Sequence, residues 1–330
     1  MKNRLTAADL RGIFPAVPTP TTPDDAVDER AVRAHMDYLI EGGIDGIVPL
    51  GGTGEYCSLS REQRVRMVAA CAGAAEGRIP TVAGILDPGY HDALAAGKAF
   101  AQAGADALML LTPYYTTPTQ SGIRDYFLRF ADASPLPVVI YEIPYRTRIA
   151  IDPEVLHGLS LHENIIGMKA CNTDMYHFLK VVAGVGDAFS VMGGEDALFP
   201  LQMAAGAQGG IIVTASVLPR TWKAIWEKAR AGRVDEAIQQ HRKLLALLDL
   251  SFAETNPGPL KSVWDLVGVD APHVLAPLLP PGEKLRQRLR AELSERLKDE
   301  AALRRGAPAI AGAPARAGRS PVVRSAPDLS

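Results

Sequence analysis

The stretch ENIIGMKACN, residues 163–172, contains a short apolar run that ends in a lysine, Lys169. The run has the length and composition of a buried strand, and a longer segment with helical character follows it. Seven further runs of this kind occupy residues 13–17, 46–50, 80–85, 107–111, 137–142, 189–194 and 209–214. Ala-rich amphipathic segments separate them, and several open on Ser, Thr or Asp and close on Gly. Eight such units predict an α/β protein built as a closed (β/α)8 TIM barrel.

An open, doubly wound sheet has the same alternation of strands and helices and is the alternative fold. Its mark would be a Gly-rich dinucleotide-binding turn after the first strand. The chain instead has the proline-rich sequence IFPAVPTPTTP at 13–23. The barrel is therefore favoured.

The strand pattern stops near residue 220, which divides the chain into three predicted parts. Residues 1–220 form the barrel domain, and residues 221–305 form a C-terminal helical extension because only helical segments continue there. Residues 306–330 are rich in Ala, Pro, Gly and Ser and contain few large apolar side chains. This last part cannot bury enough surface to fold and is predicted to be a disordered tail.

Composition narrows the classes of partner and the compartment. The formal net charge of -2 gives no support to a nucleic-acid or anionic-membrane partner, and a small neutral or anionic metabolite fits better. The N-terminus lacks an apolar core of signal-peptide length, and no long apolar run is present. The three cysteines are odd in number and lack paired spacing, and the histidines have no metal-ligand spacing. We expect a cytoplasmic protein with no membrane segment and no metal.

In a (β/α)8 barrel the reactive groups follow the C-terminal ends of the strands. Lys169 ends the sixth predicted strand and Tyr141 ends the fifth. A lysine at this place either caps an exposed strand edge or lies in a dry pocket, where burial disfavours its charged form and makes it a carbonyl-attacking amine. The apolar residues before Lys169 favour the second reading, and Tyr141, one strand away, is placed to move protons.

Two other strand ends carry polar groups, and a further polar group follows the turn after the fifth strand. The sequence GGTGEYCSLS at 51–60 offers backbone N–H groups and the Thr53 hydroxyl to a carboxylate or phosphate, although a tight turn alone also explains its glycines. Tyr115, in LTPYYTTP, is either an interface anchor or a packing residue. Arg146, in VVIYEIPYRTR, has the planar fork that binds carboxylates.

The motifs GGTGE, TPYY, YEIP-x-RT and GMK occur in this order, together with GIFPAVPTP, MGGEDALFP and NPGPLK. With them the chain resembles the dihydrodipicolinate synthase and N-acetylneuraminate lyase family of class I aldolases. The resemblance runs from about Gly12 to about residue 280. It implies a barrel with a C-terminal helical region, a homotetramer assembled from dimers, and no metal or organic cofactor.

The resemblance also assigns roles within one site. Lys169 corresponds to the lysine that forms a Schiff base with the substrate, and Tyr141 to the tyrosine that shuttles protons. Gly52 and Thr53 match the two positions that hold the carboxylate of the keto acid.

Three more residues receive roles in the same way. Tyr115 resembles the residue that reaches across the dimer to complete the proton relay of the synthase branch. Arg146 resembles the arginine at the pocket entrance that binds the carboxylate of the second substrate. Ile211 matches the position whose backbone carbonyl lines the pocket.

The chain departs from the family pattern at three positions in or near these motifs. Thr or Ser usually stands at the position of Gly52, so the hydroxyl that would relay a proton between Tyr141 and Tyr115 is missing here, and a water could take its place. Glu142 replaces the Asn of the synthase branch, and Arg148 replaces a Gly. A GGTGE sequence also resembles the sugar-acid dehydratase branch.

The sequence therefore predicts a lyase that binds pyruvate, or a related 2-keto acid, as an imine on Lys169 and condenses it with an aldehyde such as aspartate semialdehyde. The alternative within the family is an aldolase or dehydratase of 2-keto-3-deoxy sugar acids. TPYY and Arg146 favour the condensation of pyruvate with an aldehyde, whereas Gly52 and Glu142 favour the sugar-acid aldolase or dehydratase. A non-catalytic keto-acid-binding barrel is the rival from another class, and its mark would be the loss of Lys169 or Tyr141.

Overall fold

One parallel sheet organises the protein, and the computed structural model describes residues 4–305 of it, so the predicted tail at 306–330 lies outside the described residues. Within this part, seven strands follow the order β1–β7–β6–β5–β4–β3–β2, and every residue in them is buried. The strands are β1 (Gly12–Pro15), β2 (Val82–Ile85), β3 (Ala107–Leu111), β4 (Val138–Glu142), β5 (Ile165–Ala170), β6 (Ser190–Gly193) and β7 (Gly209–Ile212). Each coincides with a predicted run.

The eighth predicted run, 46–50, closes the sheet between β1 and β2. It pairs in parallel through two isolated bridges, Ala16 with Val48 and Ile47 with Thr81. The Val48 amide donates to the Pro15 carbonyl at 2.9 Å on one side, and Ile47 accepts from the amide that begins β2, also at 2.9 Å, on the other. The extended backbone ends at Leu50, whose φ is 65°. The predicted (β/α)8 barrel is thus confirmed, with seven regular strands and one short closing segment.

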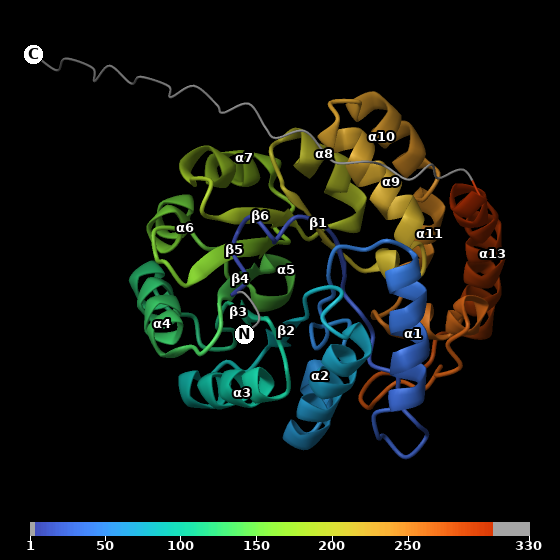
Figure 1. Ribbon diagram of the computed structural model, residues 1–330, viewed down its shortest axis with the longest axis horizontal. Helices are drawn as coiled ribbons and strands as arrows, with labels where there is room; N and C mark the ends of the chain where they lie inside the picture. The colour runs from blue at the N-terminus through green and yellow to red at the C-terminus, as the bar shows by residue number, and fades with distance from the viewer. Residues whose placement is uncertain (1–3, 306–330) are drawn as a thin grey trace, which may run out of the picture.

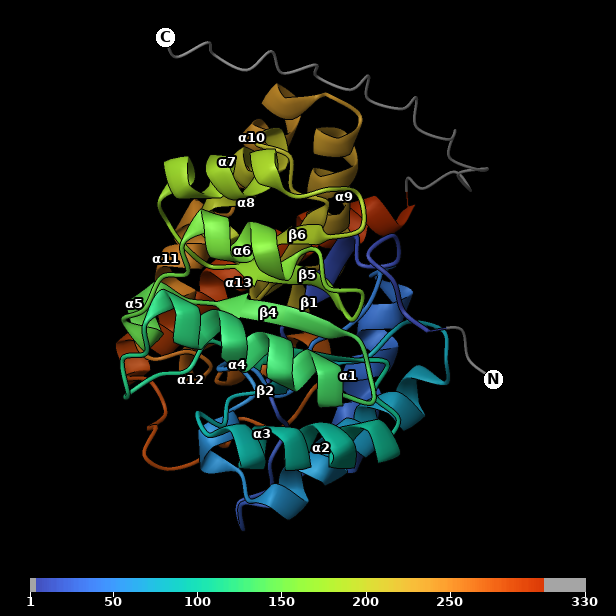
Figure 2. The same cartoon turned by 90° about the vertical axis from the view of Figure 1, so that its left-hand side faces the viewer.

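Helices surround the strands on the outside, as Figures 1 and 2 show. Several begin at predicted capping residues: the Asp28 side chain accepts from the Ala31 amide, and the Ser60 side chain accepts from the Gln63 amide. The outer helices are α1 (Glu29–Glu41), α2 (Arg61–Ala75), α3 (Tyr90–Gln102), α4 (Gln120–Ala133), α6 (Pro153–Leu159), α7 (Met175–Gly184), α8 (Phe199–Ala204) and α9 (Pro219–Arg230). Short helical turns at strand ends are η1 (Tyr56–Ser58), α5 (Pro144–Thr147), η2 (Asp196–Leu198) and η3 (Thr214–Ser216).

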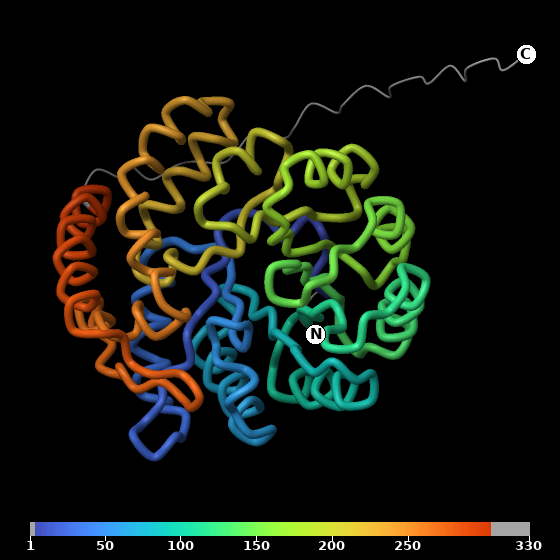
Figure 3. Tube along the Cα trace, turned by 180° about the vertical axis from the view of Figure 1, so that it is seen from behind, coloured from blue at the N-terminus to red at the C-terminus, as the bar shows by residue number. Residues whose placement is uncertain are grey.

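The remaining helices lie together on one side of the ring, coloured orange to red in Figure 3. They are α10 (Val234–Arg242), α11 (Leu245–Ser251), α12 (Gly258–Lys261), η4 (Trp264–Val267) and α13 (Glu283–Arg305). The buried Glu300 of α13 accepts hydrogen bonds from the amides of Arg220 and Thr221 at 2.7 and 2.8 Å, so it caps the start of α9. The predicted division at residue 220 falls inside α9, and the division into domains stays a prediction.

No helix within residues 4–305 has both the length and the apolar character that a membrane crossing requires.

Candidate active site

Lys169 and Tyr141 lie side by side at the carboxyl ends of two neighbouring strands. The parallel register of β4 and β5 pairs Tyr141 directly with Lys169, and both side chains face the same way because paired residues share a face of the sheet. The Lys169 Nζ is 4.7 Å from the centroid of the Tyr141 ring. The two residues are only 5% and 4% exposed. Lys169 is therefore a buried amine next to a phenol and does not cap an exposed strand edge.

The Tyr141 phenol is held in its protonated form. Burial raises its pKa well above the ordinary value, Cys171 and Glu195 act in the same direction, and Arg146 opposes them. A phenol of this kind is neutral at physiological pH. It can therefore donate a proton to a bound group and take one back, as a proton shuttle must.

The turn at 51–54 presents backbone groups at the end of the closing segment. It is wound tightly by hydrogen bonds from the Gly54 amide to the Gly51 carbonyl at 3.0 Å and from the Glu55 amide to the Gly52 carbonyl at 3.2 Å. A Cβ on Gly54 would lie 2.6 Å from the Leu50 amide nitrogen, so only glycine fits there. The glycines thus serve a tight turn, and the approach of a ligand to its N–H groups stays a prediction.

Thr53 is buried in this turn with its hydroxyl oriented by another side chain. The Asn256 Nδ2 donates to the Thr53 Oγ1 at 2.8 Å. Because the Thr53 oxygen accepts this bond, its own proton is free to point at a ligand. A hydroxyl donor beside a tight turn of N–H groups suits a carboxylate, as predicted for Thr53 and Gly52.

Arg146 lies against Gly52 and so joins the turn to the end of β4. It belongs to α5, directly after Tyr141's strand. A Cβ placed on Gly52 would lie 3.3 Å from the Arg146 Nη1 and 3.6 Å from its Cζ. The guanidinium therefore occupies the space beside Gly52 that a threonine or serine side chain would need.

Glu142 points away from these groups. It is fully buried, its Oε1 accepts from the Ile151 amide at 3.0 Å, and the same oxygen is 3.5 Å from the His177 Nε2 of α7. Its side chain thus lies between the sheet and α7, on the face opposite to Tyr141. The Glu142 side chain therefore contacts groups behind the sheet rather than Lys169 and Tyr141. Arg148 holds a φ of 62°, which explains why a glycine suits its place.

Comparison with known proteins agrees with this geometry. The model of the dihydrodipicolinate synthetase family matches residues 9–296. The chain is 37% identical over 291 residues to a 4-hydroxy-tetrahydrodipicolinate synthase of Sorangium cellulosum, covering 88% of this chain and 96% of that protein. It superposes on the crystal structure of dihydrodipicolinate synthase from Aquifex aeolicus with a TM-score of 0.84 at 30% identity, covering 87% and 98% of the two chains. The synthase of Acinetobacter baumannii complexed with pyruvate gives 0.83 at 30% identity, covering 88% and 99%.

The chain belongs to the dihydrodipicolinate synthetase family. The resemblance inferred from the ordered motifs is thus confirmed. The family match spans the barrel and most of the C-terminal helices.

One predicted residue, Tyr115, stands apart from the group around Lys169. Tyr115 is 97% exposed and holds a φ of 72°, so its ring does not reach the site of its own chain. Ile211 lies in β7 and is fully buried. The roles predicted for both stay predictions.

Sequence reasoning gave no role to two residues that the family fold brings to the site. Asn256, which orients Thr53, belongs to the NPGPLK motif, and the motif was the available signal. Glu195 follows β6 in the MGGED motif, directly beyond a strand end. Its Oε1 is buried without a hydrogen-bond partner among the described residues. A carboxylate at a strand end was the signal that could have found it.

A buried ion pair fixes the turn to the C-terminal helices. The Lys261 Nζ is 2.7 Å from the Glu55 Oε1 and donates to the Thr19 carbonyl at 2.8 Å, and both charged side chains are fully buried. The other Glu55 oxygen accepts from the Leu275 amide at 2.6 Å. Burial lowers the pKa of Lys261 and Glu55 opposes that effect. The region that follows the barrel thus holds the turn at 51–54 in place.

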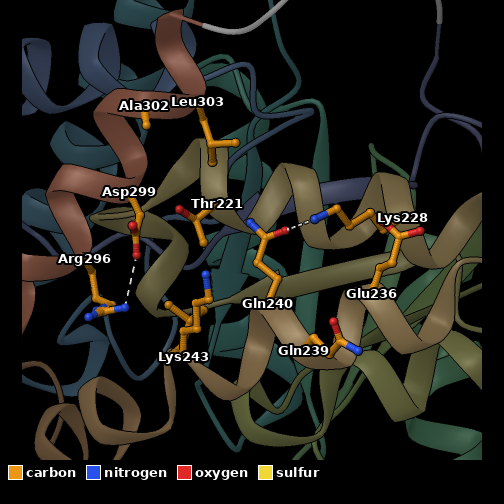
Figure 4. Close-up of a pocket in the computed structure, with 11 residues that line it drawn as sticks. Thr221, Lys228, Glu236, Gln239, Gln240, Lys243, Arg296, Asp299, Ala302 and Leu303 are labelled. Atoms are coloured by element: carbon orange, nitrogen blue, oxygen red, sulfur yellow. Dashed lines mark hydrogen bonds and ion pairs between the residues drawn. The ribbon is translucent and has the colours of Figure 1, made fainter.

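A cleft of about 460 Å³ lies elsewhere, between α9, α10 and α13, as Figure 4 shows. Some of its charged groups are paired with neighbours: Lys228 donates to Gln240 at 2.6 Å, and Arg296 is 3.1 Å from Asp299. None of the residues around Lys169 lines it. The cleft is therefore separate from the chemistry at the strand ends. Among the described residues no group of three or more His, Cys, Asp or Glu side chains could hold a metal ion.

Proposed function

We propose that this protein is a Schiff-base-forming lyase of the 4-hydroxy-tetrahydrodipicolinate synthase type, which joins pyruvate to an aldehyde, aspartate semialdehyde in the first instance. The observation that carries this proposal is the buried Lys169 amine, 4.7 Å from the Tyr141 ring at the strand ends of a family barrel. Relatives that carry this name are 33–37% identical over most of the chain.

The reaction follows from the pair. The Lys169 amine attacks the ketone of pyruvate and, with loss of water, forms an imine. The protonated imine withdraws electrons, so the neighbouring methyl group loses a proton and becomes an enamine. Tyr141 carries protons between these groups because its phenol is neutral and adjacent. The enamine carbon then attacks the aldehyde. In this scheme the protonated imine on Lys169 is the electron-withdrawing group of the reaction, so we propose no metal or organic cofactor.

The carboxylates of the two substrates are bound by different groups in this proposal. The Thr53 hydroxyl and the amides of the turn at Gly52 receive the keto acid, because Asn256 leaves the Thr53 proton free. Arg146 binds the carboxylate of the aldehyde substrate through its planar fork. Ile211 contributes its backbone carbonyl to the pocket wall.

The assembly and the location belong to the same proposal. We infer a homotetramer built from dimers in which Tyr115 reaches the site of the partner subunit, and its near-complete exposure supports such a role. We place the protein in the cytoplasm, because its cysteines suit a reducing compartment. Its partners are small keto acids and aldehydes, and we propose no nucleic acid and no membrane.

One observation favours a second candidate, an aldolase or dehydratase of 2-keto-3-deoxy sugar acids. Gly52 provides no hydroxyl for a relay to Tyr115, and Arg146 fills the space beside it. Such an enzyme would use the same imine on Lys169. A keto-acid-binding barrel without turnover is not favoured, because Lys169 and Tyr141 are both present and adjacent.

Borohydride reduction in the presence of pyruvate tests the proposal. A reduced adduct is expected on the peptide that carries Lys169, detected by mass spectrometry, because borohydride traps the imine. The variant Lys169→Arg should give none. The matched control is Lys180→Arg, an exposed lysine on the neighbouring α7, which should keep the adduct. Absence of an adduct with pyruvate and with every other 2-keto acid tried would refute the lyase assignment. A turnover screen over aldehydes and sugar acids then separates the two candidates.

A further inference from the structure

The proposed condensation needs a proton donor for the aldehyde oxygen, and Gly52 has no hydroxyl group that could relay a proton there. When the enamine carbon attacks the aldehyde, the aldehyde oxygen gains negative charge and must take up a proton. Gly52 has no side chain, and the Arg146 guanidinium stands beside it where a hydroxyl-bearing side chain would lie. An arginine cannot supply the proton, because its guanidinium stays charged in proteins. Tyr141 already moves protons at the imine in the proposed reaction, so a separate acid at the mouth of the barrel would serve the aldehyde oxygen.

Glu195 is placed to reach this region. It lies two residues beyond β6, and the register of the sheet pairs Met192 of β6 with Lys169 and Gly193 with Ala170. Glu195 therefore leaves the sheet at the same edge as Lys169, one strand away. It is in electrostatic contact with both Lys169 and Arg146. Its carboxyl group is thus near enough to the imine-forming lysine and to Arg146 for both charges to act on it.

The Cys171 thiol hydrogen-bonds to the Glu195 carboxyl group, but one oxygen of Glu195 is left without a partner. Its Oε1 is buried and makes no hydrogen bond among residues 4–305. The neighbouring Asp196 differs in this respect, because both of its oxygens accept hydrogen bonds, from the Val213 amide at 2.9 Å and from Thr214 at 2.7 and 2.8 Å. A buried polar atom without a partner is costly and calls for an explanation, of which a role in a reaction is one; Glu142 Oε2 is also unpartnered, but it lies behind the sheet, whereas Glu195 follows a strand end on the side of Lys169.

The surroundings keep this carboxyl group partly protonated near neutral pH. Burial and the adjacent Asp196 raise the pKa of Glu195 to about 7, whereas Lys169, Cys171 and Arg146 act against the rise. The other titratable groups close to it are the phenols of Tyr141 and Tyr145, which are neutral because burial raises their pKa values as well. An acid with a pKa near the working pH is well matched to proton transfer.

We propose that Glu195 is the catalytic acid that protonates the aldehyde oxygen as the new carbon–carbon bond forms. The enamine carbon supplies the electron pair of that bond, and the nitrogen lone pair of Lys169 restores the iminium. The π electrons of the aldehyde move to its oxygen, which takes the proton from the Glu195 carboxyl group. The Glu195 carboxylate regains a proton from water before the next turnover. This inference rests on the proposed function and adds a residue to it.

The variant Glu195→Gln separates this step from the earlier ones. It should form the borohydride-trapped pyruvate adduct, and it should exchange the methyl hydrogens of pyruvate with D2O, both within about twofold of the parent, since these steps need Lys169 and Tyr141. Its kcat for condensation should fall by on the order of 100-fold, the usual contribution of a general acid. In the parent, kcat should fall as the pH rises through about 7, because the acid form of Glu195 is lost. In Glu195→Gln this decline should be absent.

Two further variants complete the test. Glu195→Asp keeps a carboxylic acid, so it should recover part of the condensation rate together with the decline of kcat at high pH. This variant tests the acid role of Glu195 even if Glu195→Gln folds poorly. Glu163→Gln makes the same change on an exposed residue before β5, at the opposite end of the barrel, and should match the parent. Condensation by Glu195→Gln within about threefold of the parent, with an unchanged pH profile, would overturn the role of Glu195 alone. A parent that forms no adduct would instead overturn the proposed function on which this role depends.

Discussion

Gly52 shows how the absence of one side chain shapes the mouth of the barrel. Its Cβ position is 3.3 Å from the Arg146 Nη1, a distance at which a real Cβ forces its neighbour to move. The backbone at Gly52 does not require glycine, because its φ is not positive. The residue is therefore explained by the arginine beside it rather than by the turn itself.

The variant Gly52→Ala tests this relation. The added methyl should displace the guanidinium and raise the KM for the aldehyde substrate by roughly tenfold, which corresponds to the loss of about one charge-assisted hydrogen bond. The yield of the pyruvate adduct should change little, since the amides of the turn remain. Steady-state kinetics with each substrate varied in turn provides the measurement.

The comparison variant is Gly51→Ala. A Cβ there would meet only the Met109 Cε, at 3.8 Å, which is ordinary contact. Its effect on the KM for the aldehyde should be clearly smaller. Equal effects of the two variants would show that the turn, and not Arg146, responds to the added methyl.

At the same scale, the sequence predicted the pair Lys169 and Tyr141 for a physical reason. Neighbouring parallel strands align their carboxyl ends, so two residues that end consecutive strands must meet. The contact between Gly52 and Arg146 was not predictable in this way. It depends on the path of the short α5 after β4, and loop paths are not fixed by strand periodicity. The orientation of Glu142 toward α7 follows from the alternation of side chains along β4, because Tyr141, the residue before it, faces the same way as Lys169.

At the scale of secondary-structure elements, the turn at 51–54 depends on helices that follow the barrel. Glu55 and Lys261 are 206 residues apart in the sequence and form a fully buried ion pair. The strand and helix positions could be predicted from local patterns, and the closing segment 46–50 was recognised by its apolar run. The ion pair between Glu55 and Lys261 could not be predicted from local patterns, because it arises only from packing between distant parts of the chain.

The variant Lys261→Met should loosen the turn. Removing the ammonium leaves the buried Glu55 carboxylate without its partner, which costs about 3–5 kcal/mol in comparable buried pairs. The free energy of unfolding, measured by urea titration, should fall by about this amount, and the KM for pyruvate should rise because Thr53 loses its fixed position. The double variant Lys261→Met with Glu55→Gln should recover part of the stability, since no unpaired charge remains.

A partly exposed pair supplies the control for this prediction. Lys223 and Asp45 join α9 to the segment before the closing strand, with side chains 21% and 27% exposed. The variant Lys223→Met should cost about 1 kcal/mol or less, as solvent-accessible pairs do, and should leave the KM for pyruvate unchanged. A loss of stability in Lys261→Met no larger than in Lys223→Met would contradict the anchoring role of the buried pair.

At the scale of the whole molecule, the single chain provides a complete barrel but leaves one predicted site residue outside it. Tyr115 is 97% exposed and stands in the left-handed region with a φ of 72°. Such a backbone conformation costs a non-glycine residue about 1 kcal/mol or more, and it persists only where something offsets it. Within its own chain the exposed ring gains little. A partner subunit that covers the ring explains both features, in agreement with the homotetramer that we propose.

The variant Tyr115→Ala should therefore weaken assembly. Light scattering coupled to gel filtration should give four times the chain mass for the parent, and smaller species for the variant at low micromolar concentration, because a buried aromatic anchor is lost from the interface. The specific activity of the variant should fall with dilution in the same range. The variant Leu161→Ala removes another exposed apolar side chain, 87% exposed and placed before β5 at the other end of the barrel, and should leave the mass unchanged. A Tyr115→Ala protein with the parent's mass at every concentration would mean that this ring lies outside the subunit interface.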